Sequence, residues 1–172
     1  MQVDAVVGEV LGALERAGLT NNTLVVFTSD NGCSPAANTV ELESKGHFAS
    51  YRSRGYKADI YDGGHHIPFI ARWPGRIKAG TKSAQIVCLT DLMATCAAIV
   101  GADLPAGAGP DSRNMLPALL GETTKKPARE FSIHHSLWGV FAVRQGPWKM
   151  IPVRGSGGFT RLREVKPAAG EP

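Results

Sequence analysis

The first apolar positions of the chain recur at the spacing of a helix. Six apolar side chains are separated by intervals that keep them on one face of an α-helix: Val3, Val6, Val7, Val10, Leu11 and Leu14. Gly18 follows where such a helix would stop, because glycine readily adopts the left-handed conformation that closes helices. The pattern therefore predicts an amphipathic helix over residues 3–17.

Two short apolar runs further along are typical of strands. The run TLVVFTS (residues 23–29) is β-branched and does not alternate, as expected of a strand that is buried on both faces. HHIPFIARWPG (residues 65–75) indicates a second buried strand that ends at its proline and glycine. A helix followed by a buried strand predicts an α/β domain with a mostly parallel sheet.

The second half of the chain changes character. DLMATCAAIV (residues 91–100) predicts a helix, with Thr90 as its N-cap and Gly101 at its end. Residues 131–138 and 139–152 form two strand-like runs with a turn near Gly139, which predicts a β-hairpin. We therefore predict an α/β domain over residues 1–105, followed over residues 106–172 by a connector and a small antiparallel β subdomain.

Composition narrows the range of functions. The 172 residues carry a formal net charge of +4, and the lysines and arginines are scattered, so a nucleic-acid partner has little support. Three cysteines without a C-x-x-C spacing predict neither a disulfide framework nor a zinc site. No apolar run reaches the length of a membrane span, and the N-terminus lacks the features of a signal peptide.

Asp30 and Asn31 are the first candidates for chemistry, in the stretch FTSDNGCSPAAN. They follow the first predicted strand, and ligands bind at the carboxyl ends of strands in open α/β sheets. A carboxylate beside a carboxamide supplies the hard oxygen donors that Ca²⁺ or Mg²⁺ prefers. Because two ligands are too few for calcium, the others would have to come from elsewhere; the alternative interpretation is a structural Asp-Asn-Gly turn.

The second candidate segment is RGYKADIYDGGHH (residues 54–66), with its double glycine at Gly63 and Gly64. Its Lys57 is either a functional cation or an ordinary solvated lysine. His65 and His66 could be ligands or acid/base groups, or could form a pair with one ring packed and one ring exposed. By contrast, His134 and His135 lie in a predicted strand, whose alternation directs them to opposite faces and disfavours a joint metal site.

Four segments together carry a family resemblance. TSDNG (28–32), GYKADIYDGGHHIPFIARWPG (55–75), LTDLMAT (89–95) and AVRQGPWKMI (142–151) occur in one order and spacing. In this arrangement the chain resembles the C-terminal half of a type I sulfatase of the arylsulfatase kind. The resemblance implies an alkaline-phosphatase-like α/β fold that hydrolyses sulfate esters with a calcium ion.

The resemblance also implies roles for particular residues. By position, Asp30 and Asn31 match the family's second pair of calcium ligands, and Lys57 matches its sulfate-contacting lysine. The lysine would bind a sulfate oxygen and the ester oxygen of the leaving group, where negative charge gathers during hydrolysis. By the same comparison, His65 and His47 are candidate substrate contacts.

The sequence also departs from the family pattern. The family's nucleophile is a formylglycine made from the cysteine of C-x-P-x-R, whereas CSPAA here has Ala37 in place of the arginine. We therefore expect Cys33 not to be a nucleophile, and we expect the formylglycine and the remaining calcium ligands to lie outside this chain. His66 stands where many relatives have an arginine, so the role of that arginine is open here.

Three functional hypotheses remain. The first is a portion of a sulfatase acting on a small sulfate ester or a sulfated glycan, periplasmic or secreted by resemblance, without nucleic-acid or membrane partners. We expect the isolated chain to be inactive and, because it would expose a sheet edge and an apolar face, marginally stable. The second is a phosphoryl or phosphonate hydrolase of the alkaline phosphatase superfamily, with DGGHH supplying metal ligands. The third is a non-catalytic module that binds sulfated glycans.

Overall fold

The computed structural model describes residues 2–122 and 126–160. Contacts group the chain into two compact units. The first unit comprises Met1–Phe27 and Phe69–Ala128, and the second comprises Thr28–Pro68 and Arg129–Pro172. These units are groupings by contact, so the domain boundary that we predicted after residue 105 stays a prediction.

The predicted N-terminal helix is confirmed. Helix α1 spans Gln2–Arg16, and Gly18 follows it with a φ of 69°. Its apolar face is only partly covered, because Val7, Leu11 and Leu14 are half-buried and none of the residues of Gln2–Arg16 is buried. A short 3-10 helix, η1 (Thr20–Asn22), then leads into the first strand, β1 (Val25–Thr28).

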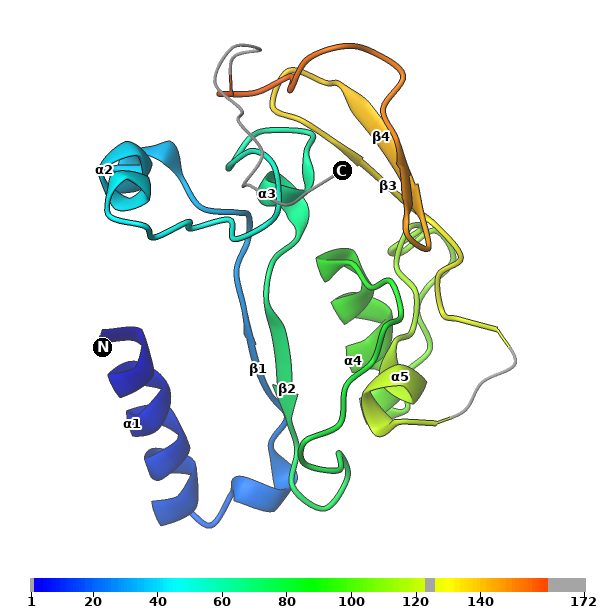
Figure 1. Ribbon diagram of the computed structural model, residues 1–172. Helices are drawn as coiled ribbons and strands as arrows, with labels where there is room; N and C mark the ends of the chain where they lie inside the picture. The colour runs from blue at the N-terminus through cyan, green and yellow to red at the C-terminus, as the bar shows by residue number, and fades with distance from the viewer. Residues whose placement is uncertain (1, 123–125, 161–172) are drawn as a thin grey trace. The chain divides into compact units, whose positions relative to one another are not determined.

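Strands β1 and β2 (Phe69–Arg72) form a two-stranded sheet, which confirms both predicted strands (Figure 1). The prediction that they are buried on both faces is wrong: β1 is half-buried throughout, and Ile70 of β2 is 60% exposed. The two strands also run in opposite directions. Thr28 at the end of β1 donates a hydrogen bond to the carbonyl oxygen of Pro68 (2.8 Å), while Trp73 donates to that of Asn21 (3.2 Å).

This pair is therefore antiparallel, although the sequence pattern predicted a sheet that is mostly parallel. A parallel pair needs a connection that crosses back to the start of the first strand. Because Thr28 lies beside Pro68, the connecting chain instead returns to the end of β1 from which it left. A helix before a buried strand predicts an α/β arrangement, but it does not determine the direction of the next strand.

The predicted helix of the first unit is confirmed, but its predicted cap is wrong. Helix α4 spans Leu92–Val100 and ends at Gly101, whose φ is 68°. Thr90 does not cap it, because a 3-10 turn, η3 (Leu89–Asp91), precedes the helix. Asp91 stands at the N-cap position of α4, but its side chain makes no capping bond to that helix. Its carboxylate instead closes η3 by accepting the backbone N–H of Cys88 (2.8 Å), and it also accepts that of Arg113 (2.9 Å).

Helix α4 is tied to the segment before α5 (Leu116–Leu120) by one buried threonine. The Thr95 hydroxyl donates to the carbonyl oxygen of Asp91 (2.6 Å) and accepts the N–H of Met115 (3.0 Å). Met115 and Trp73 are the large buried apolar side chains of this unit. Its core is therefore small and partly polar.

The second unit contains the antiparallel sheet β3-β4-β5 (Figure 1). Its strands are Ser132–His135, Phe141–Gln145 and Trp148–Met150. The predicted turn near Gly139 (φ 76°) is confirmed, but Gly146 (φ 55°) makes a second turn, so the second predicted strand is two strands. His134 is half-buried and His135 is exposed, which confirms that they face opposite sides.

Three short helices complete the described part of the second unit. The second unit holds η2 (Pro35–Ala37), α2 (Thr39–Ser44) and α3 (Asp62–His65), which fall in the long polar connection after β1. Within the part of the chain that the structure describes, no helix combines the length and apolarity needed to span a membrane.

Candidate functional site

The candidate metal ligands lie in the loop that follows β1. Asp30 is exposed and Asn31 beside it is half-buried. Ser29 donates its hydroxyl to the carbonyl oxygen of Asn31 (2.7 Å), and the Asn31 side-chain nitrogen donates to that of Gly32 (3.1 Å). These local bonds fix the loop and orient the amide of Asn31 through its nitrogen. The loop therefore presents two neighbouring side chains with hard oxygen donors, which suits the chemistry of a calcium ligand pair.

Helix α3 lies directly against this loop. The N–H of Gly32 donates to the carbonyl oxygen of Gly64 (3.1 Å). A β-carbon on Gly32 would stand 1.7 Å from the carbonyl oxygen of Gly63, well inside van der Waals contact. The Asp-Asn-Gly sequence is thus not a turn that would accept other residues at its third position, because only glycine fits there.

Lys57 lies in a neighbouring loop of the same unit. Its backbone N–H donates to the carbonyl oxygen of Cys33 (2.8 Å), two residues beyond Asn31. The turn that carries it is fixed by the fully buried Asp59, whose carboxylate accepts the N–H groups of Tyr56 (2.8 Å) and Thr160 (2.9 Å). The side chain of Lys57 itself is exposed.

The histidines differ in their surroundings. His47 is exposed just beyond α2, and His66 is exposed after α3. His65 is half-buried, and its ring centroid lies 4.3 Å from that of His134 on β3. The Nε2 atoms of these two rings are buried and, in the described part of the chain, make no hydrogen bond. Burial lowers the pKa of both, that of His134 to about 4.

The loops of Asp30, Asn31 and Lys57 are thus brought together, whereas His65 packs against the C-terminal sheet. The roles of His47 and His65 as substrate contacts stay predictions. Among the described residues, no three His, Cys, Asp or Glu side chains gather as a metal site. Cys33 is half-buried, with its Sγ 3.6 Å from the carbonyl oxygen of Ser34.

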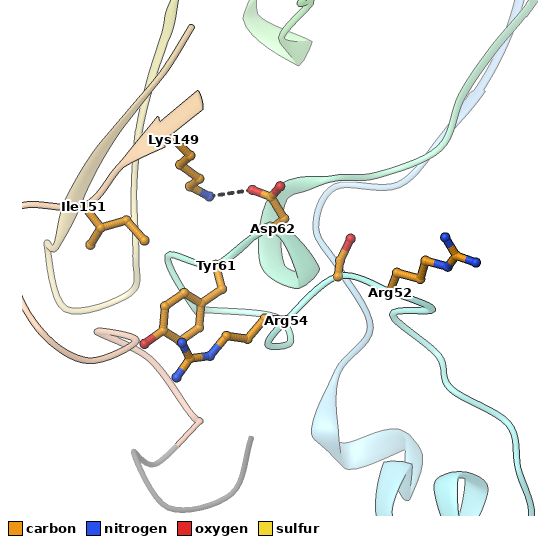
Figure 2. A pocket seen from close by; sticks show the side chains of 7 residues that line it. Arg52, Arg54, Tyr61, Asp62, Lys149 and Ile151 are labelled. Carbon is orange, nitrogen blue, oxygen red and sulfur yellow. Dashed lines mark hydrogen bonds and ion pairs between the residues drawn. The ribbon is translucent and has the colours of Figure 1, made fainter. Parts of the chain in front are cut away.

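Sequence reasoning did not identify a charged cluster between α3 and the sheet. The carboxylate of Asp62 pairs with Lys149 (2.9 Å) and with Arg144, as Figure 2 shows for the lysine. Burial alone would raise the pKa of Asp62, but these two cations outweigh it and hold that pKa below its usual value. The signal was present in the sequence, since DGGHH carries the acid and RQGPWK carries both bases.

An open pocket of about 400 Å³ adjoins this cluster. Asp62 and Lys149 line it together with Tyr61, whose ring lies 4.0 Å below the guanidinium of Arg54. Figure 2 shows Arg52, another lining residue, directed away from Arg54. The basic side chains of the pocket are therefore engaged by neighbours or diverge, and they do not converge on one point.

Comparison with known proteins places these features in a family. A family model described as sulfatase matches residues 1–102. An N-acetylgalactosamine-6-O-sulfatase from Bacteroides thetaiotaomicron is 35% identical, with 88% of this chain and 30% of the relative covered. Human arylsulfatase A is 37% identical, with 87% of this chain and 28% of the relative covered. The chain thus spans less than a third of the length of these relatives.

Solved structures agree. A Bacteroides thetaiotaomicron structure from work on the metabolism of multiple glycosaminoglycans is 34% identical, with a TM-score of 0.76 over 86% of this chain and 31% of the other. A sulfatase from Pseudoalteromonas is 30% identical, with a TM-score of 0.72 over 87% of this chain and 29% of the other. The fold is therefore part of the alkaline-phosphatase-like fold of these neighbours, and the chain belongs to the sulfatase family.

Proposed function

We propose that this chain forms part of the active site of an enzyme that hydrolyses sulfate esters. Asp30 and Asn31 supply two oxygen ligands of a calcium ion, and Lys57 binds the sulfate group. The observation that supports this best is the hydrogen bond from the Lys57 N–H to the carbonyl oxygen of Cys33 (2.8 Å). It joins the backbone that carries the lysine to the loop that carries the two oxygen donors.

The proposed chemistry follows from the charge of the ester. Hydrolysis breaks the bond between sulfur and the ester oxygen, and negative charge grows on that oxygen as the alcohol leaves. The ammonium group of Lys57 would stabilise this charge and hold a sulfate oxygen. A bound calcium ion would supply further positive charge at the sulfate oxygens.

Two components of the reaction would come from outside the chain. A calcium ion takes about six to eight oxygen ligands, and Asp30 and Asn31 account for two. The formylglycine nucleophile is likewise expected elsewhere, because CSPAA ends in Ala37 where the modified motif needs arginine. The two relatives described above differ by name in the ester that they act on, an N-acetylgalactosamine 6-O-sulfate and an aryl sulfate, so the substrate is proposed only as a sulfate ester.

The phosphoryl-hydrolase alternative has less support. It needs the acid and histidines of DGGHH as metal ligands. Asp62, however, is paired with two cations, and His65 packs against the ring of His134. These contacts favour a structural role for the segment.

The test is a kinetic comparison in the whole protein that contains this chain. We expect Lys57→Ala to lower kcat/KM for an aryl sulfate by about a hundredfold or more, because one charge contact in the transition state is lost. Lys45→Ala is the matched control, since Lys45 forms an exposed pair with Glu41 and should change kcat/KM by less than about twofold. Equal effects of the two variants would contradict the proposed role of Lys57.

A further inference from the structure

Helix α3 connects the charged cluster to the candidate site. Its first residue, Asp62, is held by Lys149 at 2.9 Å and by Arg144, which lie on β5 and β4. The side chain of Lys149 is only 10% exposed, and that of Asp62 is 32% exposed. A pair so sheltered is screened by solvent less than a surface pair. The amino group of Lys149 also donates to the carbonyl oxygen of Ile60, just before the helix.

The two residues after Asp62 form the surface on which both candidate loops rest. The carbonyl oxygen of Gly64 accepts the N–H of Gly32, and the N–H of Gly63 donates to the carbonyl oxygen of Arg54 (2.7 Å). A β-carbon on Gly63 would stand 1.9 Å from the carbonyl oxygen of Gly55. Backbones at such close approach leave little freedom, so a displacement of α3 must move both loops with it.

We propose that Asp62 is a positioning residue for the candidate site. Its ion pairs with Arg144 and Lys149 hold α3 where Gly63 and Gly64 fix the loops of Asp30–Asn31 and of Lys57. This inference rests on the proposed function for its catalytic consequence. Its structural part, the control of two loops by a distant ion pair, stands independently of that function.

Hydrogen exchange in the whole protein tests the structural part. We expect Asp62→Asn to speed exchange about tenfold in peptides covering residues 28–34 and 54–64, which contain the N–H groups of Gly32, Lys57 and Gly63. Peptides of the first unit that cover Ala94 and Met115 should exchange as in the parent protein. Asp62→Glu, which keeps the carboxylate, should restore most of the protection.

Two further variants guard against a failure to fold. Lys149→Gln and Arg144→Gln each remove one cation and should produce a smaller effect in the same two peptides. Glu41→Gln is the control, because it removes the carboxylate of the exposed pair with Lys45. Faster exchange in both units alike, or no change in any of these variants, would overturn the proposal.

Kinetics test the catalytic part. If the loops are displaced, Asp62→Asn should raise the calcium concentration for half-maximal activity about tenfold, while kcat at saturating calcium falls less. A lower kcat with unchanged calcium dependence would overturn this assignment. If the protein hydrolyses no sulfate ester at all, the proposed function fails, and the exchange result still decides the role of Asp62 in holding the loops.

Discussion

The loop that carries Asp30 and Asn31 packs so closely against α3 that position 32 has no room for a side chain. Replacing Gly32 with alanine would place a β-carbon 1.7 Å from the carbonyl oxygen of Gly63, so the loop or α3 must move. We expect Gly32→Ala to lower the free energy of unfolding by about 2–3 kcal/mol, measured by urea titration.

Gly8→Ala is the matched control for this substitution. A β-carbon at Gly8 in α1 meets nothing within 4 Å, and alanine favours helices over glycine, so Gly8→Ala should be neutral or stabilising. If Gly32→Ala were tolerated as well as Gly8→Ala, the close contact between the loop of Gly32 and α3 would be wrong.

The half-buried pair of His65 and His134 makes stability depend on pH. Burial, then the nearby charge of Lys149, lowers the pKa of His134 to about 4, below the unfolded value of about 6.5. The unfolded state therefore binds the proton first as pH falls. The contribution of neutral His134 to the free energy of unfolding should be fully present above about pH 6.5. It should be lost as the pH falls towards 4, a decrease of about 1–2 kcal/mol after allowance for partial exposure.

Urea unfolding at several pH values checks this slope. His134→Gln removes the titrating ring and should flatten the dependence between pH 6.5 and 4, apart from the share of His65. His47→Gln, at an exposed position, is the control and should leave the slope unchanged. A slope retained in full by His134→Gln would contradict the assignment.

At the scale of single residues, the sequence predicted where the candidate ligands lie but not what holds them. Asp30, Asn31 and Lys57 could be selected because their side-chain chemistry and order along the chain are visible. The contact between Gly32 and Gly63 could not, because it joins two backbones across 31 positions, and glycine leaves no side-chain pattern to follow. The ion pairs of Asp62 were missed for the same reason of long range.

Among the elements, α4 shows how a correct helix can have a wrong cap. The helix followed from its apolar composition and from Gly101, but Thr90 lies inside η3, and Asp91 takes the N-cap position with its carboxylate bonded to Cys88 in η3. Both residues are good caps by type, so only the extra 3-10 turn decides between them. The same holds for β2, whose existence was readable but whose direction depends on the path of the chain before it.

Thr95 is the position where α4 is most sensitive. Its buried hydroxyl both donates to Asp91 and accepts from Met115, so Thr95→Val leaves the Met115 N–H unsatisfied. We expect a loss of about 1–3 kcal/mol in the free energy of unfolding, measured by urea titration. Thr90→Val, at the exposed position first predicted as the cap, should change it by less than about 0.5 kcal/mol. A larger loss of unfolding free energy in Thr90→Val than in Thr95→Val would instead support Thr90 as the cap of α4.

At the scale of the whole molecule, the resemblance carried more of the prediction than periodicity did. The fold class and the family followed from four segments in a fixed order, and both are confirmed. Patterns of apolar residues overestimated burial, because they predicted fully buried strands where the described residues are half-buried or alternate. An apolar run indicates that other residues pack on both faces of a strand, but it does not identify the part of the protein to which those residues belong.

Helix α1 makes the consequence of this exposure testable. Val3 and Val6 are each 59% exposed and Val10 is 48% exposed, so the helix presents an apolar stripe to solvent. We expect this chain, studied alone, to associate with increasing concentration and to bind an apolar dye. Sedimentation of Val6→Glu combined with Val10→Lys should show weaker association, because the two charges interrupt the stripe while forming a helix-compatible pair. Gln2→Glu with Ala5→Lys adds the same two charges without removing a valine and should associate as the parent does. A parent chain that stays monomeric and melts in one sharp transition would show that the stripe drives no association.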